Sequence, residues 1–197
     1  MTYGRTVEEP AVVERARGLL GRAFSAHGVT VVITEVEAYG GIDDPASHAF
    51  TRTPRSEIMY GPPWRLYVYR SYGLHHCANI VTGPTDRAAA VLLRAGRVVA
   101  GHALAEQRRG DVGPARLARG PGNLAAALGI TLEDRGADVR TGAVRLGPPV
   151  GPPPISSGPR VGVSRAADLP WRFWVTGDPT VSAYRRSPRA SSGTSGT

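Results

Sequence analysis

The segment Val29-Thr-Val-Val-Ile-Thr-Glu-Val-Glu-Ala-Tyr39 is rich in β-branched residues and therefore predicts a strand. Side chains alternate between the two faces of a strand, so Glu35, Glu37 and Tyr39 should share one face. The same alternation places them on the face of three apolar residues, Val29, Val31 and Ile33. A buried strand that ends in carboxylates and an aromatic ring is expected to form the floor of a pocket.

A β-hairpin is predicted further along the chain. The segments Leu66-Tyr-Val-Tyr-Arg-Ser71 and His75-His-Cys-Ala-Asn-Ile-Val81 are strand-like, and they flank Tyr72-Gly-Leu74. This pattern places Tyr72 at or beside the tip of the hairpin. A third strand over residues 88–94 then completes a meander.

The rest of the chain is expected to form helices, short strands and loops. Apolar residues near helical spacing predict helices over residues 10–20, behind a capping-box pattern at 6–9, and around 98–108 and 123–128. Two further strands are expected over residues 160–164 and 172–176. The expected loops are a long surface loop at 40–63, a Pro/Gly connector at 148–154 and a disordered tail at 187–197.

Length indicates one compact domain, and the net charge is compatible with a polyanionic partner. The 197 residues can bury one substantial core, and the net charge of +8 suits nucleic acid better than a neutral metabolite. Cys77, the single cysteine, excludes an intramolecular disulfide and a multi-cysteine zinc site. The sequence has neither an apolar run of about 18 residues nor a leader pattern, so a cytoplasmic protein is expected.

The two carboxylates of the first strand allow two interpretations. An isolated Glu-x-Glu pair such as Glu35 and Glu37 is usually half exposed on a protein surface. Here it is followed by four ring-bearing side chains and an arginine, which are Tyr39, His48, Tyr67, Tyr69 and Arg94. A carboxylate surrounded by aromatic rings suits hydrolysis of a cationic substrate, because the carboxylate deprotonates water and the ring faces attract the cation.

Tyr72 and the adjacent histidines also have more than one interpretation. Tyr72 could pack on its hairpin neighbours, or it could enter a duplex and fill the gap left by an extruded nucleotide. His75 and His76 alternate between the two faces of one strand and have no third ligand nearby. A metal site is therefore not expected there.

Several blocks of this sequence together resemble the alkyladenine (3-methyladenine) DNA glycosylase family. They occur in the family's order between about residues 29 and 182, and they read Glu35-Val-Glu-Ala-Tyr39, His48, Thr53-Pro-Arg55, Leu66-Tyr-Val-Tyr-Arg-Ser-Tyr-Gly73, Cys77-Ala-Asn79, Val91-Leu-Leu-Arg94 and Pro159-Arg-Val-Gly-Val163. The resemblance implies an α+β fold. It would be a single compact domain over residues 1–186, with a curved antiparallel β-sheet, a protruding β-hairpin and flanking helices.

The resemblance also implies roles for individual residues in hydrolysis of the N-glycosyl bond. Glu37 would be the general base that activates water for attack on C1′ of a flipped nucleotide. Arg94 and the main-chain carbonyl of Val161 would help to hold that water. The flipped base would lie between three rings, Tyr39, His48 and Tyr69. Asn79 would contact the purine edge and discriminate against the 2-amino group of normal guanine.

The implied partner is double-stranded DNA that contains alkylated purines such as 3-methyladenine and 7-methylguanine. Tyr72 would be the intercalating wedge, and the other expected DNA-binding residues are Leu74, Arg55, Arg70 and Arg94. The protein is expected to act as a monomer, without a metal or another cofactor, close to the nucleoid. The alternative is a non-catalytic protein that binds distorted nucleic-acid duplexes.

The basic residues indicate which products this reaction would give. All 24 of them are arginine, so the chain has no lysine. A glycosylase that also cuts the DNA strand normally forms a Schiff base through an amine. The sequence therefore predicts a monofunctional enzyme that leaves an intact strand with an abasic site, the first step of base excision repair. Neutral bases would need protonation before they leave, and no residue is assigned as that acid, although His48 is a candidate.

Overall fold

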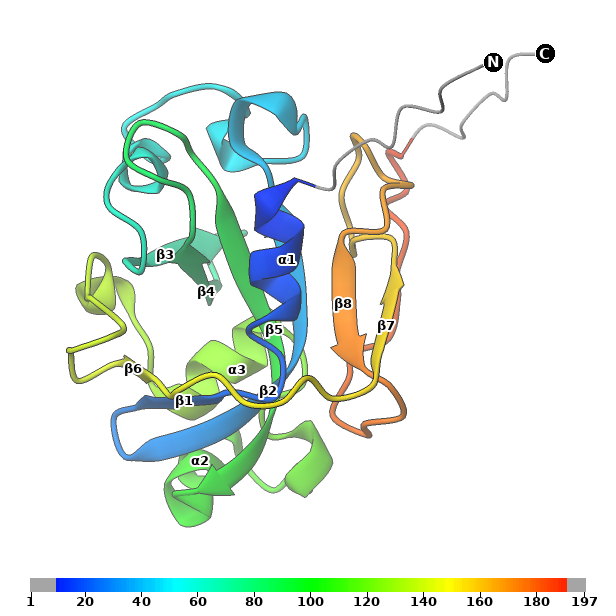
Figure 1. The fold of residues 1–197 in the computed structure, drawn as a ribbon. Coiled ribbons are helices and arrows are strands. Elements are labelled where there is room, and N and C mark those ends of the chain that lie inside the picture. The colour runs from blue at the N-terminus through cyan, green and yellow to red at the C-terminus, as the bar shows by residue number, and fades with distance from the viewer. Residues whose placement is uncertain (1–9, 191–197) are drawn as a thin grey trace.

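The long strand β2 (Val29–Tyr39) is the centre of the structure, a computed structural model that describes residues 10–190 (Figure 1). All strand pairs in this part of the chain are antiparallel, and the main sheet has the order β3-β4-β5-β2-β1-β6. The other strands are β1 (Ala23–Ala26), β3 (Leu66–Ser71), β4 (His75–Val81), β5 (Ala90–Ala100), β6 (Arg145–Leu146), β7 (Ile155–Gly158) and β8 (Arg172–Val175).

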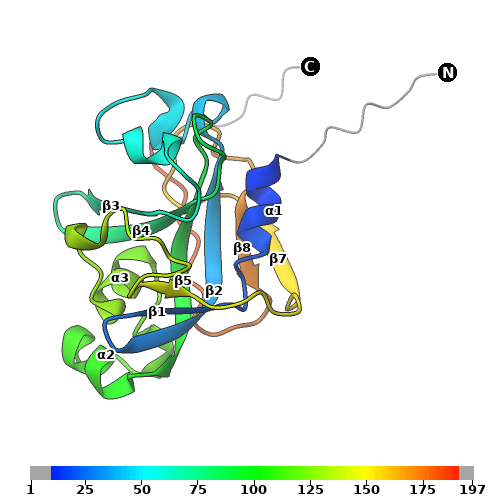
Figure 2. The ribbon, with the colours of Figure 1, turned by 60° about the vertical axis from the view of Figure 1, so that its left-hand side comes forward.

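Strand β2 has different neighbours along its length. One edge pairs with β5 over most of the strand, whereas the other edge pairs first with β1 and then with β8. The sheet curls as a result, and the β7–β8 pair lies beside the end of β2 (Figures 1 and 2). The two-residue turn between β1 and β2 has positive φ at both His27 and Gly28, which is the backbone form that two-residue hairpins favour.

An irregularity in the pairing of β2 with β5 corrects one expectation. The register shifts on both sides of Glu35. As a result, Thr34 on β2 and Arg94 on β5 have no partner residue on the opposite strand in the β2–β5 pairing. Core positions on β2 consequently change from Val29, Val31 and Ile33 to Val36 and Ala38. A strict alternation from Val29 onward was therefore wrong, because an extra residue in each strand rotates the following side chains to the other face.

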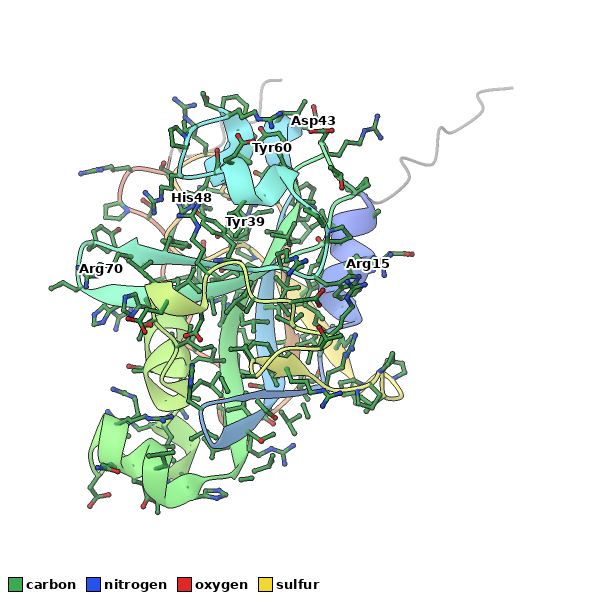
Figure 3. All side chains as sticks on the ribbon, turned by 90° about the vertical axis from the view of Figure 1, so that its left-hand side faces the viewer. Arg15, Tyr39, Asp43, His48, Tyr60 and Arg70 are labelled. Atoms are coloured by element: carbon green, nitrogen blue, oxygen red, sulfur yellow. The ribbon has the colours of Figure 1, made fainter. Side chains whose placement is uncertain are left out.

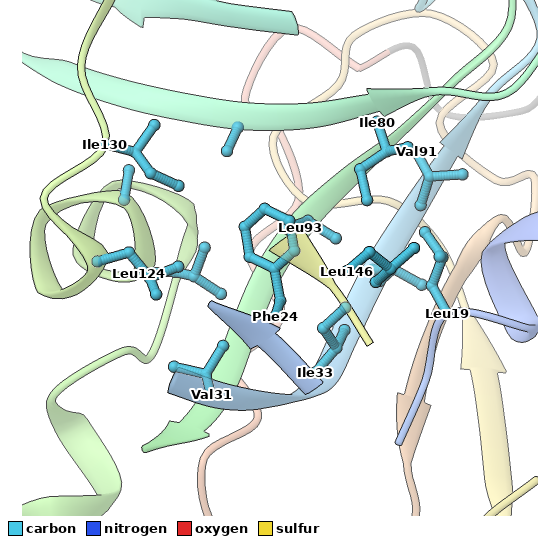
Figure 4. Close-up of a cluster of buried hydrophobic side chains, with 14 of the residues drawn as sticks. Leu19, Phe24, Val31, Ile33, Ile80, Val91, Leu93, Leu124, Ile130 and Leu146 are labelled. Carbon is cyan, nitrogen blue, oxygen red and sulfur yellow. The ribbon is translucent and has the colours of Figure 1, made fainter. Parts of the chain in front are cut away.

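The core lies between the curled sheet and the helices. There are three α-helices in the described part of the chain, α1 (Ala11–Arg17), α2 (His102–Arg109) and α3 (Pro121–Leu128). Helix α1 contributes Val12 and Val13 to the core, and α3 contributes Leu124 and Leu128. Figure 4 shows side chains from the sheet and from α3 meeting around Phe24. Apolar burial of this kind is the main force that stabilises the fold.

The α+β fold class, the single compact domain and several individual elements are confirmed. The hairpin of β3 and β4 has the expected bounds, and a helix and a strand are found close to 123–128 and 172–176. Helix α3 has proline at its first position and a left-handed glycine, Gly129, after its last residue, the pattern that usually delimits helices.

Other boundaries were wrong. Residues 160–164 form a loop, because Pro159 has no N–H to continue the β7–β8 ladder and Gly162 has a φ of +72°. Strand β5 continues through Val98 and Val99 to Ala100, so α2 begins only after Gly101, whose φ is +76°. Helix α1 ends at Arg17 rather than residue 20. Strands β1, β6 and β7 were not anticipated.

The loop over residues 40–63 has no strand or α-helix but three short 3₁₀ turns, at Gly41–Asp43, His48–Phe50 and Glu57–Tyr60. It covers one end of β2 and of β5 (Figures 1 and 2). The capping-box pattern at residues 6–9 and positions 191–197 of the expected tail lie outside the described residues. Within residues 10–190, no helix has the length and apolar character needed to cross a membrane.

Candidate active site

A cavity of about 560 Å³ lies where the end of β2, the 40–63 loop, the β3–β4 hairpin and the 159–165 loop meet. Glu37 and Tyr39 line it from β2, His48 from the 40–63 loop, and Tyr69 from β3. Figure 3 shows Tyr39 and His48 above the base of the hairpin, which extends outward to Arg70. The structure thus brings together side chains that are far apart in the sequence.

Glu37 is a fully buried carboxylate at this cavity, with zero exposed surface. Its Oε1 accepts a 2.7 Å hydrogen bond from the main-chain N–H of Val161, and its Oε2 accepts a 2.8 Å hydrogen bond from the hydroxyl of Tyr39. Nη1 of Arg94 lies 3.2 Å from Oε1. The interpretation of Glu37 as a surface carboxylate is therefore wrong. These three donors hold the carboxylate in one orientation and stabilise its charge.

Glu35 is equally buried but does not line the cavity. Its Oε1 accepts hydrogen bonds from Nε of Arg94 at 2.8 Å and Nε of Arg172 at 2.7 Å, and the main-chain N–H of Ser182 donates to Oε2. Burial acts to raise the pKa of Glu35, but the two arginines and Ser182 outweigh it and lower the pKa below its usual value. Glu35 is thus an anion at neutral pH that anchors Arg94 beside Glu37.

Three aromatic side chains form the cavity walls together with His48. The ring centroids of His48 and Tyr69 are 4.6 Å apart in an edge-to-face arrangement, and those of Tyr67 and Tyr69 are 5.6 Å apart. Nδ1 of His48 lies 3.0 Å from the Tyr67 hydroxyl. Tyr39 completes the walls from β2. Burial raises the pKa of Tyr69 well above its usual value, so the Tyr69 hydroxyl stays neutral.

His48 is expected to be a neutral imidazole at physiological pH. Burial among cavity residues, followed by the nearby positive charge of Arg55, lowers its pKa from 6.5 to about 4. An NMR titration of the imidazole resonances should therefore show a His48 midpoint near pH 4 and no ionisation between pH 6 and 8. A midpoint near 6.5 would contradict this expectation and would leave His48 available as an acid for neutral bases.

Asn79 is buried at the cavity wall. Its side-chain amide donates a 3.0 Å hydrogen bond to the main-chain carbonyl of Tyr67, its partner across the β3–β4 ladder. This bond fixes the side chain against the strand.

The tip of the hairpin projects two apolar side chains into solvent. Tyr72 is 94% exposed and Leu74 is 77% exposed. Tyr72 has a φ of +49°, a left-handed conformation that bulky residues seldom adopt. Packing on the hairpin, the first interpretation of Tyr72, is inconsistent with this exposure. Arg70 is also exposed on the hairpin, while Arg55 lines the cavity with its guanidinium 5.0 Å from the Tyr69 ring centroid.

Four residues that the sequence did not single out as parts of the site hold it together. Arg172 and Ser182 fix Glu35, as described above. Asp44 and Arg160 form a buried ion pair between the 40–63 loop and the 159–165 loop. Their sequence separation of 116 residues left no local pattern by which to find them. No group of three or more potential metal-ligating side chains occurs within residues 10–190.

Comparisons with known proteins identify the family of this chain. The sequence profile of the methylpurine-DNA glycosylase family matches residues 6–179. This chain belongs to that family. The predicted family is thereby confirmed, and the protein is a DNA glycosylase, a hydrolase of N-glycosyl bonds that acts in DNA repair.

Similar proteins of this methylpurine-DNA glycosylase family match over most of their length. A relative from Mycolicibacterium paratuberculosis is 52% identical over 189 residues, which cover 90% of this chain and 91% of the relative. One from Mycobacterium tuberculosis is 50% identical, covering 93% and 95%, and one from Cutibacterium acnes is 51% identical, covering 88% and 95%. Each carries the name "Putative 3-methyladenine DNA glycosylase".

Proposed function

We propose that this DNA glycosylase removes alkylated purines such as 3-methyladenine and 7-methylguanine from duplex DNA by a single hydrolytic step. The observation that carries the proposal is the buried Glu37 at the cavity, oriented by Val161, Tyr39 and Arg94. Within the described residues, Oε2 of Glu37 accepts only the Tyr39 hydroxyl. In the proposed mechanism, a water molecule that enters the cavity becomes the second donor to this oxygen.

In this mechanism Glu37 takes a proton from water as the water oxygen attacks C1′ of the flipped nucleotide. The bond from C1′ to the purine nitrogen breaks, and its electron pair leaves with the base. A purine methylated at N3 or N7 carries a positive charge, so it departs as a neutral base without needing an acid. Arg94 and the Val161 carbonyl are assigned to water positioning.

Tyr39, His48 and Tyr69 are proposed to enclose the flipped base. A cationic purine is attracted to electron-rich ring faces, and a neutral His48 adds no opposing charge. Extrusion is easiest for a damaged, poorly paired base, so the flipping step contributes to selection before the pocket does. Asn79 would then contact the purine edge and disfavour the 2-amino group of normal guanine.

Removal of the Tyr72 ring by Tyr72→Ala should weaken binding to lesion-containing duplex and slow base release about tenfold or more, because no wedge then fills the gap in the stack. Its 94% exposure predicts an unchanged free energy of unfolding. Leu132→Ala, at an exposed apolar residue that does not line the cavity, is the matched control. Equal activity of Tyr72→Ala and the control would refute the wedge. Fluorescence anisotropy and base-release assays measure both effects.

The proposed function is tested by incubating the protein with duplex DNA methylated by dimethyl sulfate and separating released bases by chromatography. Release of 3-methyladenine and 7-methylguanine without strand breaks is the expected result, since the chain has no lysine to form a Schiff base. Binding of the methylated duplex without base release would instead favour a non-catalytic nucleic-acid-binding protein.

We assign duplex DNA as the partner of the exposed hairpin, with Leu74, Arg70 and Arg55 near the lesion. Arg94 is assigned to the flipped nucleotide inside the cavity rather than to the outer DNA surface, because its guanidinium is already ion-paired with Glu35 and Glu37 in the cavity wall. Phosphate contacts by the surface arginines should make binding weaken steeply with salt concentration. We further propose that the protein acts as a cytoplasmic monomer at the nucleoid and needs no cofactor.

A further inference from the structure

A buried ion pair lies behind one wall of the cavity. Arg160 is 1% exposed and Asp44 is fully buried. The two guanidinium Nη atoms of Arg160 donate to the two carboxylate oxygens of Asp44 at 2.5 and 2.9 Å. Nη1 also donates to the main-chain carbonyl of Ala38 at 3.0 Å. The main-chain N–H groups of Gly40 and Ala46 donate to the same carboxylate.

The charged end of Arg160 also contacts the wall residue itself. Its guanidinium carbon lies over the Tyr39 ring, 4.8 Å from the centroid, and over the Trp171 ring at 5.3 Å. Tyr39 lines the cavity, whereas Arg160 and Asp44 do not. Arg160 thus contacts the Tyr39 ring from outside the cavity lining, which leaves the cavity side of the ring to a base.

The charge on Arg160 matters because a cation on one face of a ring competes with a cation on the other. Both draw on the same electron density of the ring, and at a buried site their mutual repulsion is weakly screened. Asp44 offsets this charge at hydrogen-bond distance. The pair as a whole is neutral, so Tyr39 keeps an attractive face for a cationic base.

We propose that Asp44 and Arg160 are specificity-determining residues that act through Tyr39. The neutral pair fixes the ring from behind while preserving its attraction for positively charged bases. This inference rests on the proposed function, since it presumes that a cationic purine enters the cavity. Neither residue touches the base, so their effect is on the preference for charge rather than on the chemical step.

The preference can be measured with two duplex probes of the same shape and different charge. One carries 7-methylguanine, a cation, and the other 7-methyl-7-deazaguanine, its neutral counterpart, each on a 2′-fluoro sugar that resists hydrolysis. Fluorescence anisotropy gives the ratio of the two dissociation constants. Wild-type protein should bind the cationic probe more tightly. Asp44→Asn, which keeps the shape and removes the neutralising charge, should reduce this preference by about threefold to tenfold.

Two further variants make the test specific. Arg160→Met leaves Asp44 as an unpaired anion behind the ring and should increase the preference for the cationic probe. The double variant Asp44→Asn/Arg160→Met is neutral again and should return the preference towards the wild-type ratio. Asp138→Asn is the matched control, because Asp138 forms a similar two-point ion pair with Arg140 at the surface and does not line the cavity.

The outcomes separate the inference from the proposed function. If Asp44→Asn and Arg160→Met weaken binding of both probes equally, the ion pair is only structural and the inference is wrong while the function stands. If the wild type binds neither probe more tightly than undamaged duplex, the proposed substrate class fails, and the inference with it. Circular dichroism melts establish that each variant is folded, and opposite shifts in the two single variants are the result that supports the proposal.

Discussion

Glu37→Gln is expected to slow the release of methylated bases by a factor of about 10²–10⁴, the range that a positioned general base usually contributes. Glutamine has nearly the shape of glutamate, and its one carbonyl oxygen can still accept the hydrogen bond from the main-chain N–H of Val161, while its NH2 group would donate to the Tyr39 hydroxyl oxygen. It cannot accept a proton from water near neutral pH. The cavity should therefore keep its shape, but the attacking water no longer has a general base to accept its proton.

The measurement is single-turnover base release from methylated duplex by wild type and variant, with binding to an abasic-site duplex measured in parallel. Binding should be retained, because Glu37 lies at the cavity rather than on the outer surface. Glu57→Gln is the matched control, since Glu57 is an exposed glutamate paired with Arg52. Base release by Glu37→Gln at the rate of the control would remove Glu37 from the mechanism.

Glu35→Gln should produce the largest loss of stability among substitutions at the site. Removing one partner of a buried ion pair typically costs about 3–5 kcal/mol, because the remaining charge is left buried without compensation. Arg94 would still be paired with Glu37, and Arg172 would keep its hydrogen bond to the carbonyl of Ser182 and its contact with the Trp174 ring. The expected loss in the free energy of unfolding is therefore at the lower end, about 3 kcal/mol. Urea unfolding at pH 7 measures it.

The same substitution should change how stability depends on pH. The pKa of Glu35 in the folded protein lies below its usual value of 4.5. Its contribution is thus fully present above pH 4.5 and is lost as the pH falls through the lower folded pKa. The difference in the free energy of unfolding between wild type and Glu35→Gln should shrink as the pH is lowered below 4.5. A difference that stays constant down to pH 2.5 would show that the charge of Glu35 does not stabilise the fold.

Local sequence patterns were sufficient for the elements whose structure depends on neighbouring residues. The β3–β4 hairpin was predictable because its two strand-like segments flank a short loop with glycine at its centre. Helix α3 was predictable from its apolar spacing. The end of β5 was not, because Val98 and Val99 fit either a strand or a helix, and their pairing with β2 decides between the two.

The register shift at Glu35 could not be predicted either. A strand pattern carries no sign of an extra residue, since the shift arises from how β2 and β5 align with each other. The shift turns Glu37 and Tyr39 towards the cavity, while Val36 and Ala38 join the core. The types of residue at the end of β2 indicated a pocket correctly. The prediction that these residues share a face with Val29, Val31 and Ile33 was wrong, because the register shift lies between the two groups.

The sequence by itself determined the family, the types of residue that line the end of β2, and the exclusion of a lysine Schiff base. These depend on which residues are present and on their order. The tertiary structure alone decided that Glu35 anchors Arg94, that Val161 donates to Glu37 and that Asp44 neutralises Arg160. Each of these contacts joins residues at least 59 positions apart. Such partners are selected by the burial of charges that must be paired, and that requirement arises only once the chain is folded.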